Sequence, residues 1–469
     1  MKKITSIGIG LVTTLTFLSN NAFAQKIAAG DGQALALCND QTVMSWGLNA
    51  NGQLGDATLT NRTAAVQVSS LTGITDIAAG TIFSIALRND GTVWSWGDNQ
   101  YGQLGNGTNT ASSVPVQVSG LSGIIAIACG KNHALVIKND STVWTWGQNT
   151  YNQLGNGNTT SSNVPIQVNG LTGIVAIAAG ESHSMTLKSN GTAWGWGLNL
   201  GGQLADGTTT QRANPVQSWA SLTGIVAFTC GKNHSLALKN DGTVWGCGLN
   251  HLGQLGNGVM NTTGCLCELS PVQSLGLTNI IAIEAGRFYS LALKSDSTVW
   301  TWGENANGQL GDGTTTSNAT PGLVAGVTGA IAVTGGRDYT VILKEDHTVW
   351  SWGNNANGQL GDSTTTEEHT PVKVKNLCQA SSGTTNIQNN ASSGNVLCYP
   401  NPSGGVFHLL VKENNMNIRI SNLLGEEVYR EKVNEGDTIL NLTDWANGIY
   451  LVQVSNGKNV FSQKISIQK

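Results

Sequence analysis

Three histidines occupy one position in successive copies of a repeated sequence, and their imidazoles could together ligate a metal ion. They lie 50 and 51 residues apart: His133, His183 and His234. In other copies this position holds Phe83, Tyr289 and Tyr339. Aromatic rings at a repeated position indicate packing, and a histidine there is more often a packed side chain than a ligand. We therefore predict no metal ion and no cofactor.

The eight cysteines are the other candidate ligands and redox groups. Cys265-Leu266-Cys267 is a single Cys-x-Cys pair, and without a second pair it is weak support for a metal site. Cys129 and Cys230 stand where most copies have alanine, so we expect buried free thiols there. Cys378 and Cys398 flank a polar segment and could close a loop across it.

No set of nucleophile, base and acid stands out in the sequence, and there is no carboxylate pair outside the repeat. We therefore predict that the protein is not an enzyme. Sites assembled in space from distant residues leave little trace in one sequence.

The repeat itself dominates the chain. Its most regular segment, Trp-x-Trp-Gly-x-Asn-x-x-Gly-Gln-Leu-Gly, is seen at residues 300–311 and returns seven times at steps of 50, 50, 50, 51, 55 and 50 residues. A fixed period of this size marks an architecture in which each unit buries its apolar faces against its neighbours.

Each copy predicts four short strands, which in the third copy are Pro115–Val118, Ile124–Cys129, His133–Lys138 and Thr142–Trp146. Four-stranded sheets repeated radially are the blades of a β-propeller, so we predict an all-β fold with a seven-bladed propeller. Only the segment from Trp-Gly to the next Pro-Val is long. Because long connections usually join blades, we expect a blade to start at Pro-Val and one blade to combine both chain ends.

The combined motif resembles the regulator of chromosome condensation repeat family over residues 27–377. It consists of Ala-Ala-Gly-x-x-His-Ser, Asp-Gly-Thr-Val-Trp and Trp-Gly-x-Asn-x-x-Gly-Gln-Leu-Gly. The resemblance implies a seven-bladed propeller. The family's eukaryotic founder is a chromatin-bound guanine-nucleotide exchange factor. We expect no such exchange here, because this chain lacks a basic arm and a long wedge-like insertion. Bacterial members resembling it include secreted binding propellers.

The N-terminal residues have the pattern of a secretory signal. Lys2 and Lys3 precede an apolar run, and Ala22-Phe23-Ala24 is a small-x-small cleavage pattern. We expect a signal peptide over residues 1–24, cleaved between Ala24 and Gln25, and a propeller over residues 25–377.

Beyond the repeats, residues 378–396 are mostly polar and predict a flexible linker. Six strand-like runs follow between Phe407 and Ile467, which predict a small Ig-like β-sandwich. Tyr-Pro-Asn-Pro at 399–402, Asn-Leu-Leu-Gly at 422–425 and Asn-Gly-Ile-Tyr at 447–450 resemble the C-terminal sorting domain of type IX secretion cargo. That resemblance, over residues 397–469, implies a bacterium of the Bacteroidota, contact with the type IX machinery, and a secreted or cell-surface protein.

Composition excludes one class of partner. The formal net charge is −4 and only 11% of residues are charged. Nucleic-acid binders carry a basic patch that neutralises phosphates. We therefore expect no nucleic-acid partner.

We thus expect a binding module for a protein or a glycan. A propeller enzyme acting on polysaccharide is the alternative, and a structural surface-layer role is the third possibility. Residues that depart from the rule of a repeat are candidates for function. On the face carrying the Gly-x-x-His turns these are Phe83, Lys131, Arg287, Tyr289, Arg337 and Tyr339. In the longest loop, which is on the same face, they are Val259, Met260 and Leu266.

Overall fold

The computed structural model describes residues 23–378 and, in the C-terminal part, residues 396–399, 406–411, 414–421, 427–446, 448–455 and 460–467. The chain forms two compact units, divided between residues 381 and 382. Within the described residues every regular element is a β-strand, and no helix there could span a membrane. Most of the predicted signal peptide (1–24) and of the predicted linker (378–396) lies outside the described residues.

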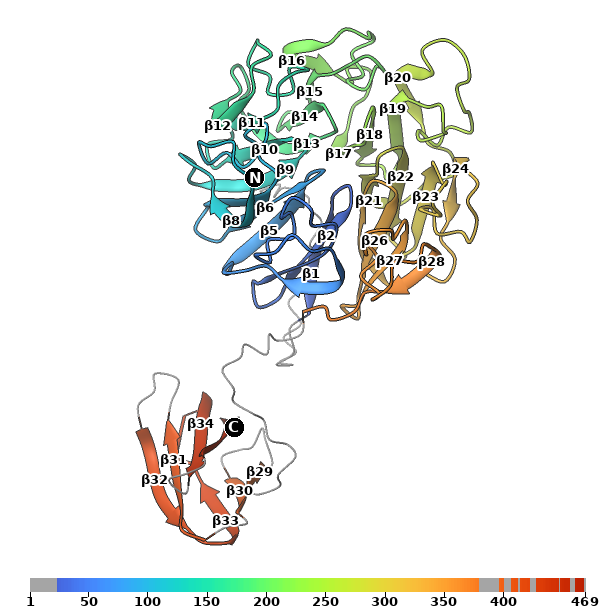
Figure 1. Cartoon of the computed structure of the whole chain (residues 1–469). Helices are drawn as coiled ribbons and strands as arrows, with labels where there is room; N and C mark the ends of the chain where they lie inside the picture. The colour runs from blue at the N-terminus through green and yellow to red at the C-terminus, as the bar shows by residue number, and fades with distance from the viewer. Residues whose placement is uncertain are drawn as a thin grey trace. The chain divides into compact units, whose positions relative to one another are not determined.

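The first unit contains seven four-stranded antiparallel sheets, each built from four strands that are consecutive in sequence. We number them sheets 1 to 7 in chain order (Figure 1). The innermost strands are β1 (Ala24–Ala29), β5 (Ile74–Ala79), β9 (Ile124–Cys129), β13 (Ile174–Ala179), β17 (Ile225–Cys230), β21 (Ile280–Ala285) and β25 (Ala330–Gly335). The second strands are β2 (Gln33–Cys38), β6 (Phe83–Arg88), β10 (His133–Lys138), β14 (His183–Lys188), β18 (His234–Lys239), β22 (Tyr289–Lys294) and β26 (Tyr339–Lys344).

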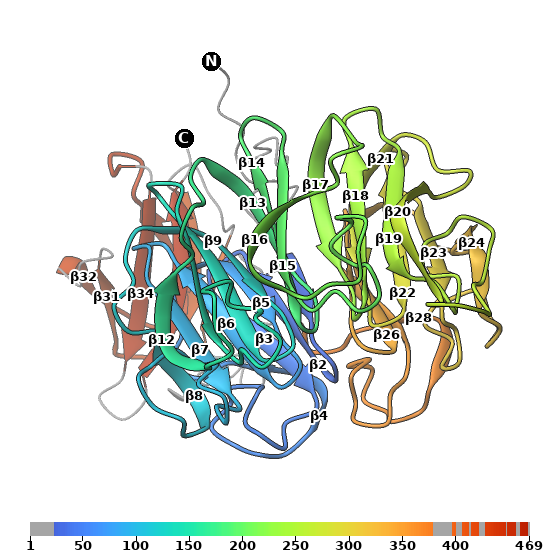
Figure 2. The same cartoon turned by 90° about the horizontal axis from the view of Figure 1, so that it is seen from above.

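The third strands carry the Trp-Gly motif: β3 (Val43–Gly47), β7 (Val93–Gly97), β11 (Val143–Gly147), β15 (Ala193–Gly197), β19 (Val244–Leu249), β23 (Val299–Gly303) and β27 (Val349–Gly353). The outer strands are β4 (Arg62–Gln67), β8 (Ser112–Gln117), β12 (Ser162–Gln167), β16 (Arg212–Ser218), β20 (Cys267–Gln273), β24 (Asn318–Leu323) and β28 (Glu368–Lys373). Each inner strand contacts the inner strands of both neighbouring sheets, and β1 contacts both β5 and β25. The sheets therefore surround a common axis, and Figure 2 shows them from a second direction.

The predicted blade boundary is wrong. Each sheet begins with the Ile-Ala-Ala-Gly strand and ends with the Pro-Val strand, so the long segment is a loop inside one sheet. The crossing to the next sheet is short, as in residues 118–123 between β8 and β9. Six extended residues reach about 20 Å, which exceeds the roughly 15 Å width of four strands. A short turn is therefore long enough, and no sheet combines the two chain ends.

A buried asparagine folds each long loop onto its own sheet. Asn99, for example, donates from Nδ2 to the carbonyls of Thr108 and Thr110, and its Oδ1 accepts from the Leu104 amide at 2.9 Å. The corresponding residues of the other sheets are also fully buried: Asn49, Asn149, Asn199, Asn250, Asn305 and Asn355. One side chain thus satisfies several buried backbone groups, which explains why a long loop needs no second sheet.

The same loop connects each sheet to the next. The indole of Trp96 is fully buried and donates to the Gln53 carbonyl of the preceding sheet at 2.9 Å. Five other tryptophans make the equivalent bond, at 2.8 to 3.0 Å: Trp46, Trp146, Trp196, Trp302 and Trp352. The glycine of the loop leaves room for the ring, because a Cβ at Gly55 would lie 2.8 Å from Trp96.

Sheet 5 is the exception to this pattern. Its third strand has Cys247 where the others have tryptophan, and the loop position facing it is Ala205 instead of glycine. Trp219, from the turn before sheet 5, is fully buried in the same apolar cluster as both residues. An indole that enters from the preceding turn therefore replaces the missing one.

Sheets 1 and 7 are joined by the same indole bond and by a covalent link. Trp46 donates to the Gln359 carbonyl, and the Ala65 amide donates to the Lys375 carbonyl at 3.2 Å. Cys38 and Cys378 form a disulfide across a sequence separation of 340 residues. The predicted pairing of Cys378 with Cys398 is therefore wrong. The predicted free thiols are confirmed, with Cys230 buried and Cys129 half-buried, whereas Cys265 and Cys267 form a disulfide.

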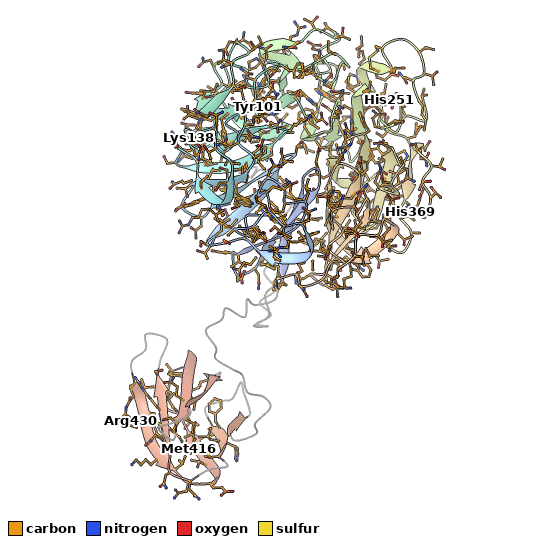
Figure 3. The ribbon with its side chains drawn as sticks, viewed as in Figure 1. Tyr101, Lys138, His251, His369, Met416 and Arg430 are labelled. Carbon is orange, nitrogen blue, oxygen red and sulfur yellow. A yellow bond between two sulfur atoms is a disulfide. The ribbon has the colours of Figure 1, made fainter. Side chains whose placement is uncertain are left out.

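The second unit contains two antiparallel sheets, in the orders β29-β30-β33 and β32-β31-β34-β35. Their strands are β29 (Val396–Tyr399), β30 (Val406–Val411), β31 (Met416–Ser421), β32 (Glu427–Val433), β33 (Gly436–Asn441), β34 (Gly448–Ser455) and β35 (Val460–Ile467). Met416, labelled in Figure 3, is fully buried in the core of this unit. The six predicted strands are present, and β29 is an additional one.

Replacing Cys38 and Cys378 by serine should lower the stability of the first unit without changing its fold. A disulfide that closes so long a loop constrains the unfolded chain and contributes up to about 5 kcal/mol. Thirteen of the 14 tryptophans precede residue 353, so tryptophan fluorescence during urea unfolding reports on this unit. The control is Cys265→Ser with Cys267→Ser, which opens a loop of a few residues. Equal effects of both pairs would contradict a closing role for Cys38–Cys378.

Cys247→Trp alone should destabilise the protein by about 1–3 kcal/mol, because the new ring would overfill a core that already holds Trp219. Adding Ala205→Gly and Trp219→Ala should restore part of the loss, since the three changes recreate the arrangement of the other sheets. Urea unfolding of the single and triple variants measures the recovery. No recovery would show that Trp219 does not take the place of the absent indole.

Candidate functional site: an axial cavity with a charged rim

A cavity of about 760 Å³ runs along the axis and is lined by the seven inner strands. At its end, each inner strand is followed by a glycine whose missing side chain permits close contact between sheets. A Cβ at Gly130, for instance, would lie 2.4 Å from the Gly180 carbonyl oxygen. The residue after each of these glycines also lines the cavity, so all seven sheets contribute to one rim.

We call these seven residues the charged rim: Asp31, Thr81, Lys131, Glu181, Lys232, Arg287 and Arg337. Their backbones are connected around the axis. The Thr81 amide donates to the Lys131 carbonyl at 3.0 Å, and the Lys232 amide donates to the Arg287 carbonyl, also at 3.0 Å. The rim therefore holds four cationic side chains and two carboxyl groups, and backbone hydrogen bonds join several of its neighbouring residues.

Ion pairs join rim residues of different sheets. Glu181 lies 3.9 Å from the Lys131 ammonium and 3.5 Å from Arg287 Nε. Since Arg287 is two sheets away, this contact shows that the rim side chains converge on the axis. Burial raises the pKa of Asp31 to about 6, and the charge of Glu181 adds to that effect.

An aromatic ring beside the rim is surrounded by cations. Lys232 Nζ and Arg287 Cζ each lie 5.1 Å from the centre of the Phe288 ring, and His251 meets its edge at 5.4 Å. His251, labelled in Figure 3, belongs to the loop after β19. This group is half-buried and contains arginine and aromatic side chains, which are enriched at protein interfaces.

Two more carboxyl groups lie close to these cations. Burial raises the pKa of both Glu304 and Asp338, and the charge of Asp338 further raises the pKa of Glu304. Asp338 pairs with Arg337 at 3.1 Å. Glu304 Oε2 is buried and has no hydrogen-bond partner among the described groups.

The structure brings Lys131, Arg287 and Arg337 together in the rim, although they come from separate copies. The predictions for Phe83, Tyr289 and Tyr339 need correction, because all three are fully buried and cannot contact a partner. Their rings fill the space toward the next sheet, so they depart from the repeat for packing reasons. The Tyr289 hydroxyl, for example, donates to the Tyr339 carbonyl.

The loop residues lie elsewhere. Val259 and Met260 are exposed and Leu266 is half-buried in the loop between β19 and β20. None of the three lines the axial cavity. A role for them in binding stays a prediction, separate from the rim.

The three histidines pack between sheets, as their alignment with aromatic residues predicts. Each imidazole Nε2 bonds to a serine hydroxyl of the following sheet: His133 to Ser184, His183 to Ser235 and His234 to Ser290, at 2.9 to 3.1 Å. Burial lowers the pKa of each to about 3. Where Phe83 replaces the histidine, the next sheet has Ala134 instead of serine. Within the described residues no group of three or more His, Cys, Asp or Glu could hold a metal ion.

Sequence reasoning missed Asp31, Lys232 and Glu284. The first two become visible when the residue after every strand-ending glycine is aligned, because that position changes charge from copy to copy. Glu284 stands at an inner-strand position that holds alanine in sheets 1 to 4. A search for polar substitutions at small-residue positions would have found it.

Comparisons with known proteins define the class. Residues 11–328 match the RCC1-like domain, and residues 330–359 and 346–387 match regulator of chromosome condensation (RCC1) repeats. The chain therefore belongs to the RCC1-like domain family. Residues 397–468 match the secretion system C-terminal sorting domain, which indicates export by type IX secretion to the cell surface or the medium.

Individual relatives match over short segments. The chain is 37% identical over 108 residues to the human probable E3 ubiquitin-protein ligase HERC6, and 42% identical over 83 residues to the Danio rerio protein RCC2 homolog. These segments cover 23% and 18% of this chain but only 10% and 16% of those relatives.

Two solved structures share the fold. Human WBSCR16 matches with a TM-score of 0.64 and 22% identity over 71% of this chain and 93% of that structure. Prp20p from Saccharomyces cerevisiae matches with a TM-score of 0.64 and 21% identity over 76% of this chain and 88% of its own. At this identity the likeness concerns the fold alone.

The buried histidines should make the protein less stable as the pH falls. Their folded pKa of about 3 lies below the usual 6.5, so the stability of the neutral state is complete above pH 6.5 and decreases toward pH 3. The double variant His183→Phe with Ser235→Ala copies the natural Phe83–Ala134 pair and removes one such group. Relative to wild type, its free energy of unfolding should increase by about 2 kcal/mol between pH 7.5 and pH 5. Urea unfolding at both pH values measures this, and parallel profiles would contradict it.

Proposed function

We propose that the protein is a secreted or cell-surface β-propeller binding module whose charged rim contacts a protein or glycan partner. The observation that carries the proposal is the convergence of one variable, mostly charged residue from every sheet on a single rim. The repeat keeps the backbone constant at this place while the side chains differ, which is the arrangement expected of a binding surface on a rigid scaffold.

The finer features of the chain belong to the same proposal. The seven sheets would be the seven blades of a propeller over residues 25–377, and the second unit would be an Ig-like sandwich over residues 397–469. A signal peptide cleaved between Ala24 and Gln25 would start export, and the second unit would complete it. Residues 378–396 would serve as the linker between them.

Partners of relatives do not transfer directly. The structure of Prp20p was reported with its binding to Gsp1p and histones. For this chain we propose neither guanine-nucleotide exchange nor a nucleic-acid partner. The sorting domain supports a location outside the cell, and the net charge of −4 does not favour binding to phosphates.

The test is capture by the purified full chain of partners from bacterial envelopes, and binding to immobilised glycans. The variant Arg287→Glu with Arg337→Glu should weaken capture by about tenfold or more, because it places like charges opposite complementary groups of the partner. The matched control is Lys138→Glu with Lys294→Glu. Each of these lysines is the last residue of a second strand, at the end of the sheet away from the rim. Equal binding by the rim variant and wild type would contradict the proposal, and so would the absence of any captured partner.

A polysaccharide-acting enzyme is the second candidate, because four carboxyl groups with raised pKa lie at or beside one cavity: Asp31, Glu284, Glu304 and Asp338. Such groups are suited to general acid catalysis near neutral pH. Release of reducing ends from a polysaccharide panel, lost in Asp31→Asn or Glu304→Gln, would favour the enzyme. Binding without release would favour the module.

A further inference from the structure

The penultimate residue of the inner strands divides the cavity into two unlike sectors. In sheets 1 to 4 it is always alanine: Ala28, Ala78, Ala128 and Ala178. In sheets 5 to 7 it is polar: Thr229, Glu284 and Thr334. All seven residues line the cavity, so at this depth one side of it is apolar and the other presents two hydroxyls and a carboxyl group.

Glu284 is the central member of the polar sector. Thr229 Oγ1 donates to Glu284 Oε2 at 3.3 Å across the boundary between sheets 5 and 6. Removal from bulk water raises the pKa of Glu284 to about 7. A carboxyl group placed at this depth opposes folding when it ionises, whereas the alanine of four other sheets would carry no such cost.

The rim above the polar sector is also distinct. Sheets 5, 6 and 7 contribute Lys232, Arg287 and Arg337, three successive cations, whereas no other pair of neighbouring sheets contributes two. Glu284 precedes Arg287 by three residues, so the Cα atoms of the two residues are at most about 10 Å apart. Anion-binding groups and a hydroxyl-accepting group thus lie at two depths of one sector.

We propose that this polar sector binds a sugar acid, free or at the end of a glycan, with its carboxylate at the rim cations and its hydroxyls on Glu284, Thr229 and Thr334. Arginine and lysine recognise carboxylates, and an ionised carboxyl group accepts hydrogen bonds from hydroxyls. The alanines and isoleucines of the opposite wall face the apolar side of a sugar ring. A cavity of about 760 Å³ is within the range of small-molecule sites.

The charge of the rim decides against an organic amine as the occupant. An ammonium group that enters at the rim would be repelled by Lys232, Arg287 and Arg337 before it reaches Glu284, whereas hydroxyl groups are neutral donors. The inference rests on the proposed binding function and names the chemical class that its cavity would select.

The experiment is isothermal titration calorimetry of the purified full chain with D-glucuronate and D-galacturonate. Glucose and galactose, the uncharged sugars that correspond to these acids, serve as the neutral matches. At least one acid should bind, and its neutral match should bind about tenfold or more weakly, because a neutral sugar forms no ion pair with the rim cations. Glu284→Ala should weaken acid binding by a similar factor. This variant keeps a foldable inner strand, since alanine occupies the same position in four sheets. Glu345→Ala, in an exposed turn between the second and third strands, is the matched control and should leave binding unchanged.

Equal binding of acids and neutral sugars, no binding at millimolar concentration, or unchanged binding in Glu284→Ala would each overturn the inference. The proposed function is tested separately. If capture of a partner depends on Arg287 and Arg337 while neither acid binds, the sugar-acid site is contradicted and the proposed binding function is kept. If the acids bind through Glu284 but no captured partner depends on the rim, the proposed binding function is contradicted and the sugar-acid site is kept.

Discussion

The first unit depends on one interaction more than any other: in six of the seven sheets a buried indole N–H donates to a glutamine backbone carbonyl in the loop of the preceding sheet. Trp96 and Gln53 show the geometry, and five further pairs repeat it. The bond satisfies two buried polar groups at once and places the largest side chain of the repeat against its neighbour. Because the strands of each sheet pack mainly against those of its two neighbours, this bond helps to set the spacing at six of the seven boundaries between sheets.

Replacements within the repeat occur in matched sets. Where Cys247 replaces the indole, Ala205 replaces the facing glycine and Trp219 fills the space. Where Phe83 replaces histidine, the next sheet has alanine instead of the serine that an imidazole requires. These sets show that the residues at facing positions of two adjacent sheets depend on each other. Close packing tolerates a change in one sheet only when the neighbouring sheet compensates for it.

The side chains of the charged rim take no part in the tryptophan–glutamine bond between sheets, so they can differ from copy to copy. Its residues follow glycines whose closeness to the next sheet fixes the backbone, so that side chains as different as Asp31 and Arg287 stand in equivalent places. Sheets 5 to 7 hold three of the four rim cations and all three polar residues at the penultimate inner-strand position, among them Glu284. A rigid, regular scaffold with one irregular sector is well suited to selective binding, because little conformational entropy is lost when a partner docks.

The sequence by itself determined the all-β class, the number and type of strands in each repeat and the packing role of the histidines. It could do so because strand alternation and turn residues are local signals, and because seven copies report the same answer. The sequence also pointed to Lys131, Arg287 and Arg337, since they vary within a constant motif.

Only the tertiary structure decided where a sheet starts, because a long connection can either cross to the next sheet or fold back on its own. The buried Asn99 and its equivalents hold this connection folded back on its own sheet. Likewise, only the structure separated the buried Tyr289 from its rim neighbour Arg287, and joined Cys38 to Cys378. Burial and proximity across the ring are properties of the assembled sheets, and no single repeat contains them.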